Sequence, residues 1–90
     1  GEHMWGHARH GIVPDIVTIG KPAGNGHPIG IVVTRRDLMD RFNEKYGFFS
    51  TFGGNNVSSE VGIAVLDVFE DERLLDNCRV VGKHFLDGLT

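Results

Sequence analysis

Two short runs of apolar, mostly β-branched residues in the first third of the chain predict β-strands. Residues 15–19 (DIVTI) and 29–34 (IGIVVT) are apolar on both faces, which is typical of strands buried in a parallel sheet. The segment between them, residues 21–28, holds two prolines and two glycines and predicts a turn. Because this connection is short, the two strands are also suited to antiparallel pairing with each other.

Beyond the second strand the spacing of apolar residues changes to that of helices. Thr34 is suited to cap a helix that runs from residue 35 to about residue 42, with an acidic residue in its first turn. Residues 47–54 contain three glycines and three phenylalanines without helical spacing, and we expect them to form a loop.

The last third of the chain predicts two helices. Asn55 or Asn56 is a suitable N-cap for the first, whose apolar residues recur at helical spacing over residues 57–69. The acidic run at residues 70–72 predicts a break, because acidic side chains suit the start of a new helix better than the end of an old one. A broad apolar face then predicts the second helix over residues 74–89.

Composition and charge exclude several classes of function. The net charge is −3 with no basic face, so we expect no nucleic-acid partner. No apolar run approaches the ~20 residues of a membrane-spanning helix, so we expect no membrane partner. Cys78 is the only cysteine, which precludes an internal disulfide and favours a reducing, cytoplasmic location. The glycine-rich start and helical end suggest that residues 1–90 are part of a larger domain.

Lys21 is the residue with the clearest chemical potential. It directly follows the first predicted strand, so rigid backbone would present its amine at a fixed point, where it can attack a carbonyl group. Gly20, Gly24 and Gly26 would let the backbone approach a ligand closely. The residue types alone favour a surface lysine in a loop over a reactive one, since neither a dinucleotide-binding fingerprint nor a phosphate-binding P-loop is present.

Two motifs in order resemble a known enzyme family. Residues 14–22 (PDIVTIGKP) and 24–28 (GNGHP) resemble the cofactor-lysine segment of class III aminotransferases, which are fold-type I enzymes dependent on pyridoxal 5′-phosphate (PLP). Residues 50–55 (STFGGN) resemble a second family segment, and residues 64–68 (AVLDV) resemble the helix after it. The GNGHP form is similar to the branch that contains alanine–glyoxylate aminotransferase 2-like proteins and phospholyases.

The resemblance implies both fold and site. It implies an α/β fold in which residues 1–90 are part of the PLP-binding large domain, with two strands around the cofactor lysine and helices leading toward the small domain. Lys21 would carry PLP as a Schiff base, and Thr51 would donate a hydrogen bond to the cofactor phosphate of a neighbouring subunit. The remaining cofactor contacts would lie outside residues 1–90. The implied enzyme is a homodimer with shared active sites.

Amines or amino acids and keto acids or aldehydes are the substrates implied for an aminotransferase. A lyase acting on a phosphorylated amino-alcohol would use the same lysine, so the segment does not separate the two reactions. The alternative from another class is a non-catalytic fragment or interaction domain that shares only the ancestral segment. In every case we expect residues 1–90 alone to be inactive.

The histidines are weaker candidates for a site. His3, His7 and His10 have spacings that suit metal ligands on one helix face, but the neighbouring glycines disfavour a helix, so we expect no metal site. His27 lies in the turn after Lys21, where we expect it to brace the backbone rather than to act as an acid or base.

Overall fold

The computed structural model describes residues 1–89, so Thr90, the last residue of the predicted partial domain, lies outside the described residues. It contains two strands and three α-helices, in keeping with the expected α/β class. In chain order the elements are the 3₁₀ helix η1 (Gly6–His10), β1 (Ile16–Ile19), the 3₁₀ helix η2 (Lys21–Ala23), β2 (Ile31–Thr34), α1 (Arg36–Lys45), α2 (Asn56–Asp71) and α3 (Leu74–Leu89).

These elements form two compact units, and each is described by itself. One unit is the continuous segment Pro14–Val65, which contains both strands, α1 and the first part of α2. The other combines Gly1–Val13 with the chain from Leu66 onward, and it contains η1 and α3. All the candidate site residues of the resemblance lie in Pro14–Val65.

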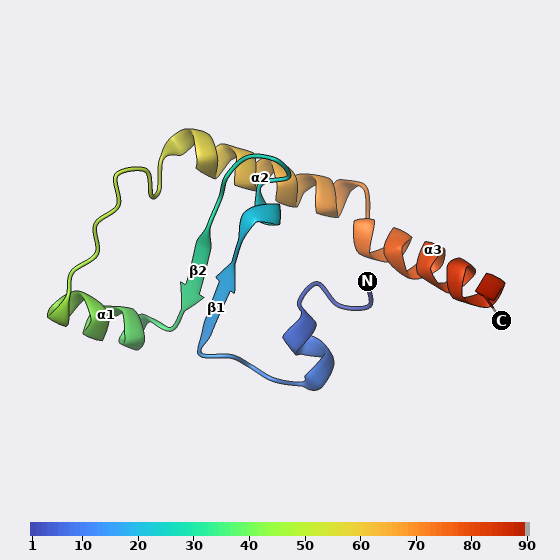
Figure 1. The fold of residues 1–90 in the computed structure, drawn as a ribbon, viewed down its shortest axis with the longest axis horizontal. Coiled ribbons are helices and arrows are strands. Elements are labelled where there is room, and N and C mark those ends of the chain that lie inside the picture. The colour runs from blue at the N-terminus through green and yellow to red at the C-terminus, as the bar shows by residue number, and fades with distance from the viewer. Residues whose placement is uncertain (90) are drawn as a thin grey trace. The chain divides into compact units, whose positions relative to one another are not determined.

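β1 and β2 form an antiparallel pair. The sequence was compatible both with this pairing and with strands of a parallel sheet. The register places Ile16 opposite Thr34 and Ile19 opposite Ile31. Figure 1 shows the two strands side by side, with their connection running past the first part of α2. The positions of both strands agree with the prediction, although β2 starts two residues later than expected.

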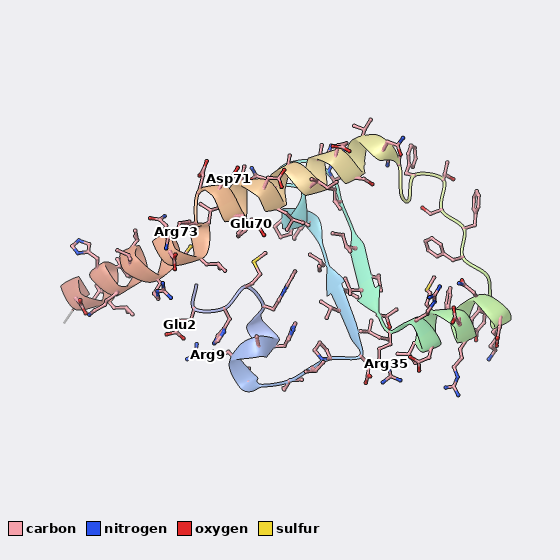
Figure 2. The ribbon with its side chains drawn as sticks, turned by 180° about the vertical axis from the view of Figure 1, so that it is seen from behind. Glu2, Arg9, Arg35, Glu70, Asp71 and Arg73 are labelled. Carbon is pink, nitrogen blue, oxygen red and sulfur yellow. The ribbon has the colours of Figure 1, made fainter. Side chains whose placement is uncertain are left out.

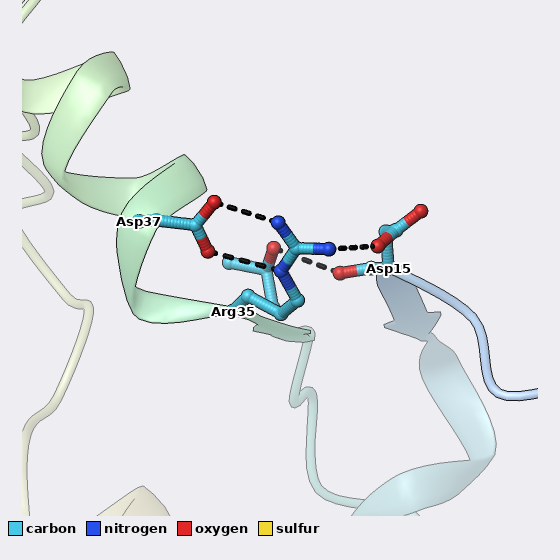
Figure 3. Close-up of polar contacts among 4 residues, drawn as sticks. Asp15, Arg35 and Asp37 are labelled. Carbon is cyan, nitrogen blue, oxygen red and sulfur yellow. Dashed lines mark hydrogen bonds and ion pairs between the residues drawn. The ribbon is translucent and has the colours of Figure 1, made fainter.

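The open end of this hairpin is closed by a charged cluster (Figure 3). The register brings Asp15 beside Arg35, and the guanidinium of Arg35 donates to the carboxylates of Asp15 and Asp37 at 2.7 Å each. The hydrogen bond from Arg35 lowers the pKa of the Asp37 carboxyl below its usual value. Thr34 was expected to cap α1, and this prediction is wrong: its hydroxyl donates to the Asp15 backbone carbonyl at 2.9 Å, across the strand pair.

α2 begins with a cap that the sequence predicted. The side chain of Asn55 accepts a hydrogen bond from the Ser58 backbone N–H at 2.9 Å, so Asn55 rather than Asn56 is the N-cap. The Asn55 side chain also donates to the Phe52 carbonyl at 2.6 Å, which ties the cap to the preceding loop. The order of loop and helix is therefore as expected.

The break between α2 and α3 lies where the acidic run predicted it. Glu70 and Asp71 end α2, and Arg73, at φ 51°, turns the chain into α3, as the labelled side chains in Figure 2 show. The reason predicted for this break was wrong, because Glu70 and Asp71 lie at the end of α2 and not at the start of α3. Arg73 donates to Asp76 in the first turn of α3, and this bond lowers the pKa of Asp76.

No hydrophobic side chain among residues 1–89 is buried. The strands predicted to be buried on both faces are exposed or half-buried at every position, because no further layer of this chain covers them. Gly24, in the connection between the strands, is the single buried residue in the described part of the chain. None of the described helices has the length and apolar character needed to cross a bilayer.

Candidate functional site

Lys21 lies at the point where β1 ends. Gly20 leaves the strand with extended backbone, and Lys21 is the first residue of the single-turn helix η2, followed by Pro22 at a position that favours a helix start. The Lys21 side chain is exposed, and within residues 1–89 no carboxylate pairs with its amine. The short strand and the proline fix the backbone from which this amine extends.

The turn that follows Lys21 is closed by overlapping backbone hydrogen bonds. Gly20 O accepts from Ala23 N at 3.0 Å, Pro22 O accepts from Asn25 N at 3.0 Å, and Gly24 O accepts from His27 N at 3.0 Å. Each bond starts inside the span of the one before it. The backbone from residue 20 to residue 27 therefore has no free hinge.

Two features explain the glycines of this turn. Asn25 and Gly26 adopt φ values of 48° and 107°, which favour asparagine and glycine respectively. Gly24 has an ordinary φ of −93°, but a Cβ atom there would lie 2.1 Å from the His27 carbonyl oxygen. Glycine is therefore required at position 24 for space and at position 26 for backbone conformation.

Thr51 lies in the loop before α2, and its side chain is exposed. The loop is ordered by its neighbours: Ser50 Oγ accepts from Gly53 N at 2.9 Å, and Gly54 adopts φ 73°. The Asn55 cap then joins this loop to the first turn of α2. A free hydroxyl is thus presented on a short, internally bonded loop beside a helix start.

One side-chain contact connects the Lys21 turn with this helix start. His27 Nε2 and Ser58 Oγ lie 2.9 Å apart in a half-buried hydrogen bond between residues 31 positions apart. No hydrogen bond links Lys21 directly with Thr51 in the described chain. The contact is compatible with the expected bracing role of His27, and it is made to the side chain of Ser58. Ser58 was missed, since an isolated serine in a helix carries no signal of such a contact.

The three N-terminal histidines do not form a cluster of metal ligands. His7 stacks with Trp5, with ring centroids 6.4 Å apart. Throughout residues 1–89, no group of three His, Cys, Asp or Glu side chains is arranged to hold a metal ion.

Comparison with known proteins decides the family. The family model described as "Aminotransferase class-III" matches residues 1–90. This chain belongs to the class III aminotransferases. Alanine–glyoxylate aminotransferase 2 homolog 2, mitochondrial, of Arabidopsis thaliana is 44% identical over 98% of the chain. Ethanolamine-phosphate phospho-lyase homolog 1 of Caenorhabditis elegans is 41% identical over 92% of it, and human alanine–glyoxylate aminotransferase 2, mitochondrial, is 40% identical over 96%.

The chain spans 17–18% of the length of these curated relatives. No solved structure matches it. The family resemblance drawn from the two motifs is thus confirmed, and both kinds of protein expected in the branch that the GNGHP segment indicated occur among the relatives.

The side chains at the two motifs of this class III aminotransferase segment fit PLP, the cofactor of the family. An exposed primary amine suits the cofactor's aldehyde, and an exposed hydroxyl beside the loop of Gly53 and Gly54 suits a phosphate oxygen. The close packing at Gly24 holds the backbone that carries the amine.

Proposed function

We propose that the protein containing this chain is a PLP-dependent aminotransferase in which Lys21 is the lysine that attaches the cofactor. One observation carries the proposal: the family match covers residues 1–90, and the exposed amine of Lys21 extends from a hydrogen-bonded turn at the end of β1. The substrates would be an amino acid or amine and a keto acid or aldehyde.

Lys21 would have two roles. Its Nζ would hold PLP through the carbonyl carbon of the cofactor, which would supply an electron-withdrawing ring when bound. When not engaged in that link, the same Nζ would be the base that accepts the proton from the substrate α-carbon. Both roles require the amine to return to the same place, which the closed turn of residues 20–27 favours.

Peptide mapping tests the assignment of Lys21. The full-length protein is incubated with PLP and reduced with borohydride, which converts the lysine–cofactor linkage into a stable secondary amine. We expect the added mass on the peptide that contains Lys21, and we expect Lys21→Ala to abolish it. An adduct on Lys45 or Lys83 instead would refute the assignment.

We further propose that Thr51 donates its hydroxyl to the cofactor phosphate in the neighbouring subunit of a homodimer. A phosphate dianion needs several donors, and a hydroxyl together with backbone N–H groups near a helix start is a suitable source. Thr51 is exposed and is followed by two glycines and the capped start of α2, which supports the role. The reach into the neighbouring subunit is inferred from the family resemblance.

Subunit complementation tests this arrangement. Lys21→Ala and Thr51→Ala variants of the full-length protein are prepared separately, mixed and allowed to exchange subunits. If Thr51 serves the other subunit, each mixed dimer combines both lesions in one site and leaves the second site intact, so the activity per mixed dimer recovers toward half of wild type. Confirmed exchange without recovery above the two parent variants would refute the shared site.

A PLP-dependent lyase is the second candidate function, because the nematode relative is named as a phospho-lyase homolog and is 41% identical. Transfer of an amino group from alanine to glyoxylate yields pyruvate and glycine, whereas elimination from ethanolamine phosphate releases inorganic phosphate. We expect the full-length protein to form pyruvate from alanine and glyoxylate. Phosphate release from ethanolamine phosphate without pyruvate formation would assign the lyase reaction.

The domain assignment follows from the same reasoning. We propose that residues 1–90 are part of the PLP-binding large domain together with the start of the helical segment between domains. The cytoplasmic location stays a prediction, and the Arabidopsis and human relatives are themselves named as mitochondrial proteins.

A further inference from the structure

The hydrogen bond between His27 and Ser58 has no role in the proposed function described so far. Both residues are half-buried in a chain whose side chains are otherwise largely exposed, and their atoms lie 2.9 Å apart. Within residues 1–89, this is the only side-chain hydrogen bond that joins the turn of residues 21–28 to another element. The contact therefore links the turn directly to the first turn of α2.

Apolar packing at the same place supports this role. The half-buried residues of α2 within the unit Pro14–Val65 recur at helical spacing and form one face of the helix: Ser58, Val61, Gly62 and Val65. Ile29 Cδ1 lies close to this face, 3.8 Å from the position of a Cβ atom built at Gly62. The same methyl group lies 3.1 Å from a Cβ built at Gly24, so it packs between the turn and the helix.

The position of His27 is transmitted to Lys21 through the backbone. The three overlapping bonds of the turn run from Gly20 to His27 without a gap, so a displacement at one end moves the other. Lysine has a long side chain with four rotatable bonds, so the protein controls the location of its amine mainly through the backbone from which it starts. Holding His27 therefore holds the origin of the Lys21 side chain.

Ser58 is anchored in a corresponding way. Its backbone N–H donates to the Asn55 side chain, and the same side chain donates to the Phe52 carbonyl. The His27–Ser58 contact thus joins two hydrogen-bonded segments, one carrying Lys21 and the other adjoining the Thr51 loop. The contact therefore connects the two family motifs, around Lys21 and around Thr51, which lie apart in the sequence.

We propose that His27 and Ser58 are positioning residues for Lys21, because their hydrogen bond holds the lysine-bearing turn against the first turn of α2. The inference rests on the proposed function of Lys21. Neither residue is assigned a contact with substrate or cofactor.

The test compares deletion of the contact with its conservative replacement in the full-length protein. His27→Ala and Ser58→Ala remove one partner each, and His27→Gln and Ser58→Thr keep a hydrogen-bonding group at each position. His84→Ala and Ser59→Ala are matched controls. Within residues 1–89 the exposed His84 side chain makes no side-chain hydrogen bond, and the Ser59 hydroxyl bonds within its own helix start. Two measurements are made: hydrogen exchange of residues 20–28 in the cofactor-free protein, and the rate of PLP attachment trapped by borohydride.

We expect His27→Ala and Ser58→Ala each to slow attachment at Lys21 about tenfold, since misplacement of a reacting group by ~1 Å can cost up to ~100-fold in rate. Exchange of residues 20–28 should accelerate in both variants. The double alanine variant should be no worse than either single one, which shows that the two residues act as a unit. His27→Gln, Ser58→Thr and both controls should stay close to wild type.

Unchanged exchange and attachment in His27→Ala, or effects of the two alanine variants that simply add, would overturn the inference. Failure of the proposed function looks different: a borohydride adduct that survives Lys21→Ala would show that another lysine attaches the cofactor. An adduct lost in Lys21→Ala but formed at the normal rate in His27→Ala refutes only the positioning role.

Discussion

Gly24→Ala is the substitution whose effect is most sharply defined by the structure. At φ −93° and ψ 6° the backbone of position 24 is accessible to alanine, so no conformational strain is expected. The obstacle is the His27 carbonyl oxygen, which would lie 2.1 Å from the new Cβ atom. Because the oxygen belongs to the backbone, it cannot move aside by a rotamer change.

The size of the effect follows from one stabilising and two destabilising contributions. Replacing glycine by alanine at a compatible backbone position stabilises a protein by about 0.4–1 kcal/mol. Separating Cβ and oxygen to an ordinary contact of ~3.5 Å requires a movement of roughly 1.4 Å, and overpacking of this kind costs about 1–3 kcal/mol. The movement also disturbs the bond from His27 N to Gly24 O, at about 0.5–1.5 kcal/mol. We expect a net local destabilisation of about 2 kcal/mol.

Hydrogen exchange of the His27 amide in the full-length protein measures this change directly. A loss of about 2 kcal/mol corresponds to roughly 30-fold faster exchange through local opening. Gly30→Ala is the matched control, since no atom of residues 1–89 lies within 4 Å of a Cβ built there and its φ is not left-handed. Exchange in Gly24→Ala that is equal to or slower than in Gly30→Ala would refute the steric argument.

Three further outcomes are expected. Asn55→Ala should destabilise the start of α2 by about 1 kcal/mol and accelerate exchange of the Ser58 amide, whereas Asn56→Ala should not; equal effects would contradict the capping assignment. In urea titrations Asp37→Asn should lower stability at pH 7, and its difference from wild type should shrink as the pH falls below about 3.9. A carboxyl with a lowered folded pKa stabilises above its unfolded pKa and stops doing so as the pH falls through the folded value. Residues 1–90 alone should show neither transaminase activity nor a cooperative calorimetric transition, since the described chain buries no hydrophobic side chain.

The elements of this fold were predictable because their signals are local. β-branched runs, a turn with two prolines and helical spacing indicate β1, the connection and α2 without knowledge of distant contacts. The Asn55 cap is a local signal of the same kind, since its bond spans three residues. The motif around Lys21 also indicated the family, which the residue types alone did not identify.

The features that were missed depend on contacts between distant parts of the chain. Thr34 has the residue type of a helix cap, but the strand register places its hydroxyl beside the Asp15 carbonyl, 19 positions away, and that bond prevails. Ser58 has no distinctive sequence context, and its role depends on His27 being brought to it by the turn. The strands are also uncovered within residues 1–89, because an apolar pattern shows that a face suits burial but not which segment covers it.

The two ends of the hairpin are held by different kinds of interaction. We therefore expect substitutions at the two ends to differ in their effect on the rate of PLP attachment at Lys21. At the open end, Arg35 bonds two carboxylates, but all three side chains are more than half exposed, and exposed ion pairs contribute little to stability. At the turn end, Gly24 is buried and the histidine–serine contact is half-buried, so small displacements there meet close packing. Asp37→Asn should therefore leave the rate of PLP attachment unchanged, whereas Gly24→Ala should slow it about tenfold. Equal rates in the two variants would show that the packing of the turn does not control the position of the lysine.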